Sequence, residues 1–371
     1  MTDVLILGGG VVGLSLAYEL TARGRRVAVV EQNAEVGRES SWAGAGILPD
    51  AVYRPGDPPL EQLAGKAIPL HVEWAERLQR ETGVDNGYRR CGGVYLADDD
   101  TTLAKLEHEA TDWRRQGLAH ESLDAASLAK VEPALADAFR SGRIIRGYHL
   151  PSEAQLRNPW HMQALTAACR QRGVEFHTGA ACEDFVVRNG RVVEVSTARG
   201  PLSAEQFALC SGAWTGKLAE RLGLRLGIRP IRGQIALLHP AKPLINGIVT
   251  VGRRYFVPRA DGRVLVGSTE EDVGFDKSNT AAVMADLLQF ACSLAPELRG
   301  APLERTWAGL RPYSADDLPY IGPVPNVANA FVAAGHYRWG LTLSTATAVC
   351  LTQLMHGESP LVDLTAFRLD R

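Results

Sequence analysis

Arg311 stands in the stretch WAGLRP, residues 307–312, where it could hold a small anion. Its guanidinium is a planar fork of donors that matches the two oxygens of a carboxylate, and it stays charged at any working pH. Pro312 restricts the backbone of Arg311 to an extended conformation, which fixes the direction of the side chain. Arg311 is therefore a candidate to hold a carboxylate, with a salt bridge between domains as the alternative.

A second arginine, Arg338, lies in GHYRWG, residues 335–340, directly before a predicted helix over 342–355. Gly335 and Gly340 would let the backbone approach a flat ring closely. The free N–H groups at a helix N-terminus favour negative charge. The loop is therefore suited to the end of a flat ring on which negative charge collects when the ring is reduced, with a basic residue on a surface turn as the alternative.

The first 31 residues predict the element that would hold such a ligand. An apolar run over residues 4–7 is followed by Gly8, Gly10 and Gly13 in G-x-G-x-x-G spacing, a helical pattern, a second apolar run and Glu31. These glycines permit a tight turn, a close approach to a pyrophosphate and close packing of the helix on the strand. Glu31 is placed to accept hydrogen bonds from ribose hydroxyls. The order strand, glycines, helix, strand and acid predicts a bound adenine dinucleotide, against a βαβ unit with no ligand.

The fingerprint does not choose between NAD and FAD, but the next segment favours FAD. Residues 38–50, RESSWAGAGILPD, form a run of small residues that could lie against a flat ring and its ribityl chain. A flexible loop is the alternative for this run. No second G-x-G-x-x-G occurs later, so the sequence gives no sign of a separate NAD(P)H domain.

Several motifs in a fixed order then define a resemblance. SSWAGAGIL follows the fingerprint, and LCSGAW (209–214), WAGLRP, LPYIGPV (318–324) and GHYRWG come later. Together they resemble the FAD-dependent amine and amino-acid oxidases of the D-amino-acid oxidase superfamily. Within it the chain is most similar to the glycine oxidases that feed thiazole synthesis in thiamine biosynthesis, over essentially its whole length.

The resemblance implies a set of residues that bind FAD non-covalently, because no cysteine stands where some sarcosine-oxidising relatives attach their flavin. His336 is expected to support its loop and not to transfer protons. The expected cofactor-binding residues are Gly8, Gly10, Val11, Val12, Gly13, Glu31, Gln32, Ser40, Ser41, Ala43, Gly44, Ala45, Gly46, Ile47, Cys182, Ser211, Gly212, Trp214, Gly335, His336, Tyr337, Arg338, Gly340, Leu341 and Thr342.

For the substrate, the resemblance implies Arg311 as the main carboxylate anchor, Arg338 on the substrate side and Tyr255 on the opposite side. Tyr255 could instead simply pack within its strand. At the family's apolar pocket position, fifteen residues beyond this tyrosine, the chain carries Glu270. That carboxylate could hold an ammonium or a second amine, or it could turn to solvent and leave the pocket small. Both versions predict a polar rim that does not suit a bulky apolar D-amino acid.

The implied reaction passes a hydride from Cα to flavin N5, after which the imine hydrolyses to a 2-oxo acid and ammonia, and O2 reoxidises the flavin to give H2O2. Binding of the substrate as the free amine would remove the need for a general base. One alternative keeps the fold in a D-amino-acid or N-methyl-amino-acid dehydrogenase that passes electrons to a quinone. Another is a nucleotide-binding protein that uses its cofactor structurally.

Composition narrows the partners. The chain has 371 residues, of which 46% are hydrophobic, and its formal net charge is −2 with a sequence pI near 6.5, so neither nucleic acid nor an anionic membrane is expected. The six cysteines form no C-x-x-C pair and the histidines show no metal spacing, which predicts reduced thiols, a cytoplasmic protein and no metal. The N-terminal apolar run is not expected to be a signal peptide, and no run of ~18 apolar residues predicts a membrane span. The resemblance implies a homo-oligomer.

The predicted fold class is α/β, with a Rossmann-like FAD-binding domain interleaved with an α+β substrate domain that has a mixed or antiparallel sheet. Hairpins are predicted to turn at Asn189-Gly190 and over 260–262, and residues 101–140 are predicted to form two surface helices. By resemblance the FAD-binding domain takes 1–90, 149–224 and 310–371, and the substrate-binding domain takes 91–148 and 225–309.

Overall fold

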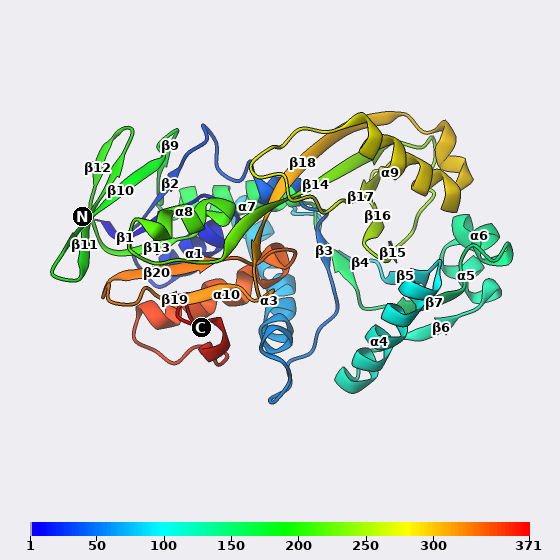
Figure 1. The fold of residues 1–371 in the computed structure, drawn as a ribbon, viewed down its shortest axis with the longest axis horizontal. Helices are drawn as coiled ribbons and strands as arrows, with labels where there is room; N and C mark the ends of the chain where they lie inside the picture. The colour runs from blue at the N-terminus through cyan, green and yellow to red at the C-terminus, as the bar shows by residue number, and fades with distance from the viewer. Residues whose placement is uncertain (1) are drawn as a thin grey trace.

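A six-stranded sheet carries the N-terminal fingerprint. The computed structural model describes residues 2–371, and Figure 1 shows this sheet and a second, larger one toward opposite ends of the molecule. The six strands are parallel except β19 and follow the order β19-β20-β13-β1-β2-β9. Their bounds are β1 Thr2–Leu7, β2 Val27–Glu31, β9 Glu175–Thr178, β13 Ala204–Leu209, β19 Tyr320–Pro323 and β20 Ala330–Ala334.

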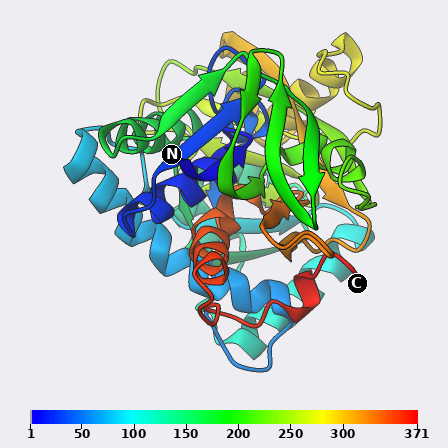
Figure 2. The same ribbon diagram turned by 90° about the vertical axis from the view of Figure 1, so that its left-hand side faces the viewer.

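Both faces of this sheet are covered, which explains the continuous apolar runs of its strands. Val4 and Ile6 of β1 pack against the helices on one face, and Leu5 and Leu7 pack under a three-stranded sheet on the other. Figure 2 shows this end of the molecule, with the small sheet in green and α10 in red-orange. The covering elements are α1 Val11–Ala22, α3 Pro59–Thr82, α7 Asn158–Gln171, α10 Gly340–Met355, β10 Cys182–Arg188, β11 Arg191–Thr197 and β12 Gly200–Leu202.

The second sheet has eight strands in the order β18-β14-β17-β16-β15-β5-β7-β6. All its pairs are antiparallel except β15 with β5, so the expectation of a mixed sheet is confirmed. The strands are β5 Gly93–Ala97, β6 Glu121–Leu123, β7 Arg146–Leu150, β14 Ile228–Leu238, β15 Ile248–Val251, β16 Arg254–Pro258, β17 Val264–Gly267 and β18 Leu303–Ser314. The helices on this part are α4 Asp100–Gln116, α5 Ala125–Val131, α6 Ala136–Arg140 and α9 Ala281–Leu294.

Both predicted hairpins are confirmed, as β10–β11 and β16–β17. Asn189 and Gly190 have φ values of 50° and 69°, the left-handed pair that a two-residue turn of this kind needs. The expectation for residues 101–140 is wrong in part, because β6 lies between α4 and α5 and pairs with β7. The domain ranges stay a prediction; the division at 309/310 falls within β18.

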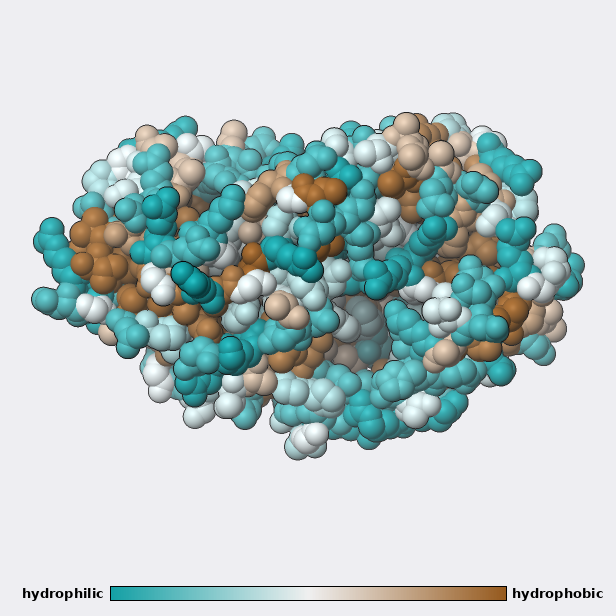
Figure 3. All heavy atoms as spheres, in the orientation of Figure 1, coloured by the Kyte–Doolittle hydropathy of each residue, from teal (hydrophilic) through white to brown (hydrophobic). Residues whose placement is uncertain are grey.

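Short elements join the two large sheets. They are α2 Ser40–Ala43, α8 Thr215–Glu220, the 3-10 turn η2 Gly212–Trp214, and the strands β3 Ile47–Leu48, β4 Arg89–Arg90 and β8 Ala154–Gln155. Within residues 2–371, no helix combines the length and the apolar character that crossing a membrane requires. Figure 3 shows a largely hydrophilic face that is hollowed near its centre.

A buried acid, Glu153, lies at the junction of these strands. Its side chain accepts a hydrogen bond from the hydroxyl of Tyr95, and its backbone carbonyl accepts the amides of Cys91 and Gly92 at 3.0 Å each. Burial raises the pKa of Glu153 to about 8, although the Tyr95 bond acts in the opposite direction. Because an unfolded glutamate loses its proton near pH 4.5, only the folded chain holds this proton between about pH 5 and 8.

We expect Glu153→Gln to make the protein more stable in alkali. The folded state binds one proton more than the unfolded state in this window, so the free energy of unfolding falls as pH rises through it. Glutamine can still accept the bond from Tyr95 but does not titrate. Urea unfolding should find the variant close to the parent at pH 5 and more stable, by a few kcal/mol in order of magnitude, at pH 9. If the free energy of unfolding fell with pH equally for parent and variant, the prediction would be contradicted. Glu121→Gln is the control, because Glu121 is exposed.

Candidate active site

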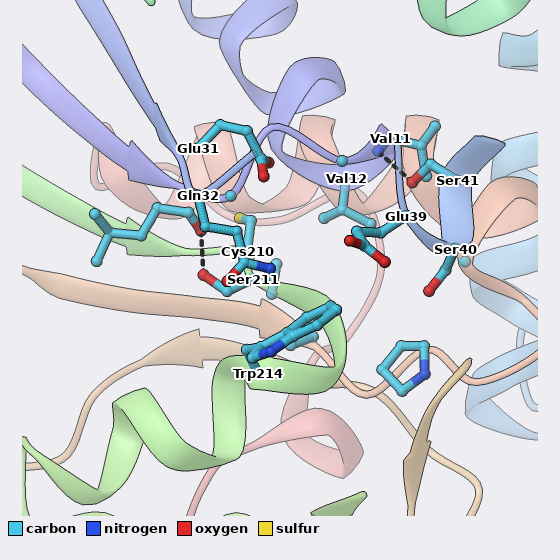
Figure 4. A pocket seen from close by; sticks show the side chains of 18 of the residues that line it. Val11, Val12, Glu31, Gln32, Glu39, Ser40, Ser41, Cys210, Ser211 and Trp214 are labelled. Carbon is cyan, nitrogen blue, oxygen red and sulfur yellow. Dashed lines mark hydrogen bonds between the residues drawn. The ribbon is translucent and has the colours of Figure 1, made fainter. Parts of the chain in front are cut away.

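A cavity of about 530 Å³ runs from the fingerprint to the two predicted arginines. It brings together segments that lie far apart in the sequence, and Figure 4 shows several of their side chains around it. The predicted site residues that line it are Gly8, Gly10, Val11, Val12, Glu31, Gln32, Ser40, Ser41, Cys182, Ser211, Gly212, Trp214, Arg311, His336, Tyr337, Arg338, Gly340 and Leu341.

The turn from β1 into α1 is built from glycine because other backbone lies against it. Gly8 has a φ of +112°, and a Cβ there would lie 2.5 Å from the carbonyl oxygen of Cys210. A Cβ at Gly13 would lie 2.0 Å from the carbonyl oxygen of Gly8. Helix α1 begins at Gly10, whose position carries no capping side chain, and the amide of Val11 donates to Oγ of Ser41 at 2.8 Å. The amides that follow Val11 in the first turn are the ones left for a ligand in the cavity.

Glu31 ends β2 with its carboxylate held in place. It accepts the amide of Gly9 at 3.0 Å and the amide of Asn33 at 2.8 Å. Burial raises the pKa of Glu31, while these two backbone bonds act to lower it. The side chain lines the cavity beside Gln32, which places an acceptor at the position expected for ribose hydroxyls.

The walls beyond the fingerprint come from η2 and from α2. Ser211 donates its hydroxyl to the carbonyl of Leu7 at 2.7 Å, and Ser41 accepts the amide of Val11 at 2.8 Å. Figure 4 shows both bonds, with Trp214 and Ser40 also beside the cavity. These contacts tie two distant segments to the ends of β1 and α1.

The loop over residues 335–340 is fixed from both sides. Tyr337 has a φ of 48° and donates its amide to the carbonyl of Pro312 at 2.9 Å, which joins the loop to the Arg311 strand. His336 is buried, with its Nε2 3.1 Å from the hydroxyl oxygen of Thr347 in a hydrogen bond. Burial lowers the pKa of His336 to about 3. Helix α10 has no capping side chain at its start, so this second helix N-terminus also opens on the cavity.

Arg311 lies on β18 with its guanidinium held at one edge of the cavity. Nη1 donates to the carbonyl of Thr269 at 2.9 Å, and Nη2 donates to Oγ of Ser268 at 2.7 Å. A Cβ at Gly233 on the neighbouring β14 would lie 2.3 Å from Nη1, so this glycine makes room for the side chain. The group remains charged and keeps further N–H donors for a ligand.

Tyr255 lies close to the same segment but does not line the cavity. It is buried, and a Cβ at Gly267 would lie 2.7 Å from its ring. Gly267 precedes Ser268 and Thr269, the two residues that hold Arg311. The role of Tyr255 toward a substrate carboxylate therefore stays a prediction.

Glu270 faces Arg338. Its Oε1 accepts from Nη1 of Arg338 at 3.1 Å, and its Oε2 accepts from Nη1 of Arg253. The carboxylate side chain is only 13% exposed and does not line the cavity. Its charge is thus balanced by two guanidinium groups of the protein, at the edge where Arg338 enters the cavity.

The remaining predicted residues lie behind the cavity wall. The carbonyl of Ala43 accepts the indole N–H of Trp307 at 2.9 Å, and the carbonyl of Ala45 accepts Nη2 of the buried Arg259 at 2.7 Å. Their cofactor roles stay predictions. Predicted residues that do not line the cavity are Gly13, Ala43, Gly44, Ala45, Gly46, Ile47, Gly335 and Thr342, together with Tyr255 and Glu270.

The structure adds cavity residues that the sequence analysis missed. Asn158 opens α7 and donates Nδ2 to the carbonyl of Ser41 at 2.7 Å, while its Oδ1 is buried with no partner among the described residues. The dipeptide Asn158-Pro159 was a signal for a helix start, but it gave no sign of this contact. Arg38, Glu39 and Lys217 also line the cavity.

The fold and this cavity define a dinucleotide-binding protein, and comparison with known proteins identifies the family. The model of the family described as FAD dependent oxidoreductase matches residues 3–354, and the chain belongs to this family. The cofactor is therefore FAD.

Individual relatives agree with this assignment. The chain is 38% identical to the glycine oxidase of Pseudomonas putida, over 97% of this chain and 96% of that protein. The crystal structure of glycine oxidase from Geobacillus kaustophilus superimposes with a TM-score of 0.93 at 31% identity, over 100% of this chain and 98% of that one. The chain is also 32% identical to the bifunctional protein ThiO/ThiG of Nostoc sp., covering 95% of this chain and 52% of that protein.

Proposed function

We propose that the protein oxidises glycine and uses O2 as its electron acceptor. Glycine, water and O2 would then give glyoxylate, ammonia and H2O2. One observation carries the proposal: Arg311 lines the same cavity as Gly8, Gly10 and Glu31, so a carboxylate donor set lies within reach of the dinucleotide site. The names of the relatives in Pseudomonas putida and Geobacillus kaustophilus support the choice of amino acid.

The residues present fit FAD. The N-termini of α1 and α10 open on one cavity, and each can offer amides to negative charge, although at α1 the first amide is already donated to Ser41. In the proposal the start of α1 holds the pyrophosphate, Glu31 accepts the ribose hydroxyls, and the start of α10 faces the pyrimidine end of the ring. When bound, FAD supplies the acceptor for the hydride that leaves the substrate Cα.

The protein's own part in the reaction is to hold and orient the substrate. Arg311 would bind the carboxylate through its free N–H donors, with Ser268 and Thr269 fixing the direction of the guanidinium. Held in this way, the Cα–H bond has one orientation relative to the ring, which lowers the entropic part of the barrier. A substrate bound as the free amine needs no side chain to take its proton, and water then converts the released imine to glyoxylate and ammonia.

The choice of a small substrate rests on the polar edge near Arg338. Arg338 lines the cavity there and pairs with Glu270 behind the wall, and burying the side chain of a bulky apolar amino acid against this guanidinium would cost free energy. The proposal also places the reaction in thiamine thiazole synthesis, supported by the likeness to the protein named ThiO/ThiG. A reducing, cytoplasmic setting is supported by six cysteines without paired spacing.

Anaerobic titration of the purified yellow protein tests the proposal. Glycine should bleach the flavin absorbance more readily than sarcosine, D-alanine or D-proline, and air should then restore the colour with release of H2O2. Bleaching only by another amine would overturn the choice of substrate. Slow recolouring in air, sped up by a quinone, would overturn O2 as the acceptor and indicate a dehydrogenase.

A further inference from the structure

Residues 271–279, which connect β17 to α9, reach from the eight-stranded sheet to the wall of the FAD cavity. We call them the crossing segment. Its side chains do not line the cavity themselves, but they contact three residues that do: Glu39, Trp214 and Lys217. Figure 4 shows Glu39 and Trp214 extending toward the cavity from different elements.

The base of the crossing segment is firmly held on β14. Glu271 and Arg232 exchange backbone hydrogen bonds at 2.8 and 3.0 Å, and Nη2 of Arg232 donates to the carboxylate of Glu271 at 2.6 Å. Nη1 of Arg232 binds Asp276 at 2.5 Å. At the far end the amide of Thr280 donates to Oε1 of Gln234 at 2.8 Å. Arg232 is buried, so its bonds to Glu271 and Asp276 hold the crossing segment on both sides of its middle residues.

Phe275, in the middle of the crossing segment, packs on the cavity wall. Its ring lies 5.3 Å from the ring of Trp214, centroid to centroid, and the ammonium of Lys217 lies 4.2 Å above it. Phe275 is half-buried in these contacts. Such aromatic and cation contacts limit the rotamers of Trp214, so the wall keeps its shape because Phe275 lies behind it.

Lys277 forms a salt bridge with Glu39, a second residue of the cavity wall. Its ammonium donates to both oxygens of Glu39, at 2.9 and 3.0 Å. Glu39 lines the cavity together with Gly10 and Val12, near the helix start that would receive the pyrophosphate. An unpaired carboxylate there would repel the phosphates, and Lys277 neutralises it.

We propose that the crossing segment retains FAD: Phe275 braces the Trp214 wall, and Lys277 masks the charge of Glu39. Both residues act through side chains of the cavity wall and do not line the cavity themselves. The proposal rests on the family's cofactor and not on the choice of glycine. The tests therefore measure FAD affinity, and their failure would leave the proposed substrate untouched.

The first test removes the Phe275 ring that packs against Trp214. Phe275→Ala should weaken FAD binding about tenfold and speed its release by a similar factor, followed as the rise in flavin fluorescence after dilution of the holoenzyme. Val273→Ala is the matched control, because Val273 is in the same segment and 41% exposed. Equal release rates for Phe275→Ala and the parent would overturn the role of Phe275.

The second test is a charge cycle on the pair of Lys277 and Glu39. Lys277→Gln should weaken FAD binding about fivefold by leaving the charge of Glu39 without a counter-charge, since Nδ2 of Asn33 donates to Glu39 at 3.1 Å but is neutral. Adding Glu39→Gln should restore the parent affinity. Reconstitution of the apoprotein with FAD gives the four dissociation constants. A Glu39→Gln, Lys277→Gln double variant as weak as Lys277→Gln alone would overturn the masking role, as would a Lys277→Gln variant that binds FAD like the parent.

Discussion

Arg311→Met should lower kcat/KM for the amino-acid substrate by about a hundredfold to a thousandfold. The change removes the fork that would bind the substrate carboxylate, and truncating one partner of such a charge pair costs about 2–5 kcal/mol. Methionine keeps an unbranched stem that can lie over Gly233, where the guanidinium now fits. Steady-state kinetics with oxygen consumption measures the loss, and the FAD content of the purified variant should stay at the parent level.

Two further variants separate the shape of Arg311 from its charge. Arg311→Lys keeps the positive charge without the fork, so we expect it to fall between the parent and Arg311→Met. Arg254→Met removes an arginine that pairs with Asp286 on the surface, and it should leave kcat/KM unchanged. An Arg311→Met variant with the parent KM and kcat would contradict the assignment of Arg311 as the carboxylate anchor.

The sequence was most informative where neighbouring residues determine the structure. The turn at Asn189-Gly190 needs two left-handed residues in succession, and the chain supplies two that adopt this conformation easily. The fingerprint is also local, because strand, turn, helix and Glu31 all follow within 31 residues. Apolar runs at β1 and β2 predicted strands buried on both faces, and the structure covers both faces.

Features that depend on long-range pairing gave no comparable signal. Gly233 matters because β14 pairs with β18 in a register that places it two residues from the partner of Arg311. Nothing around Gly233 in the sequence specifies that register. The pairs Glu270 with Arg338 and Lys277 with Glu39 likewise join loops from different parts of the chain. A charged residue in a loop predicts exposure, and only the fold shows which charge it faces.

Gly8→Ala should produce a protein that purifies without bound FAD, with an affinity at least about a hundredfold below that of the parent. The new Cβ would lie 2.5 Å from the carbonyl oxygen of Cys210, and a φ of +112° is strained for any L side chain. Neither the β1 turn nor the β13 end can move alone, because the amide of Cys210 donates to Leu7 at 2.8 Å. The start of α1 must shift instead, and with it the amides offered to the pyrophosphate.

Gly24→Ala is the control for a glycine with a positive φ that does not line the cavity. Gly24 also has a positive φ, +78°, but nothing lies within 4 Å of a Cβ built there. It should therefore lose only about 1–2 kcal/mol of stability from the left-handed conformation and still purify with FAD. Visible absorbance of the purified proteins and the FAD affinity of their apoproteins give the comparison. Loss of FAD by Gly8→Ala alone would show that the effect is specific to the cofactor turn, whereas equal loss by both variants would show general destabilisation and contradict the prediction.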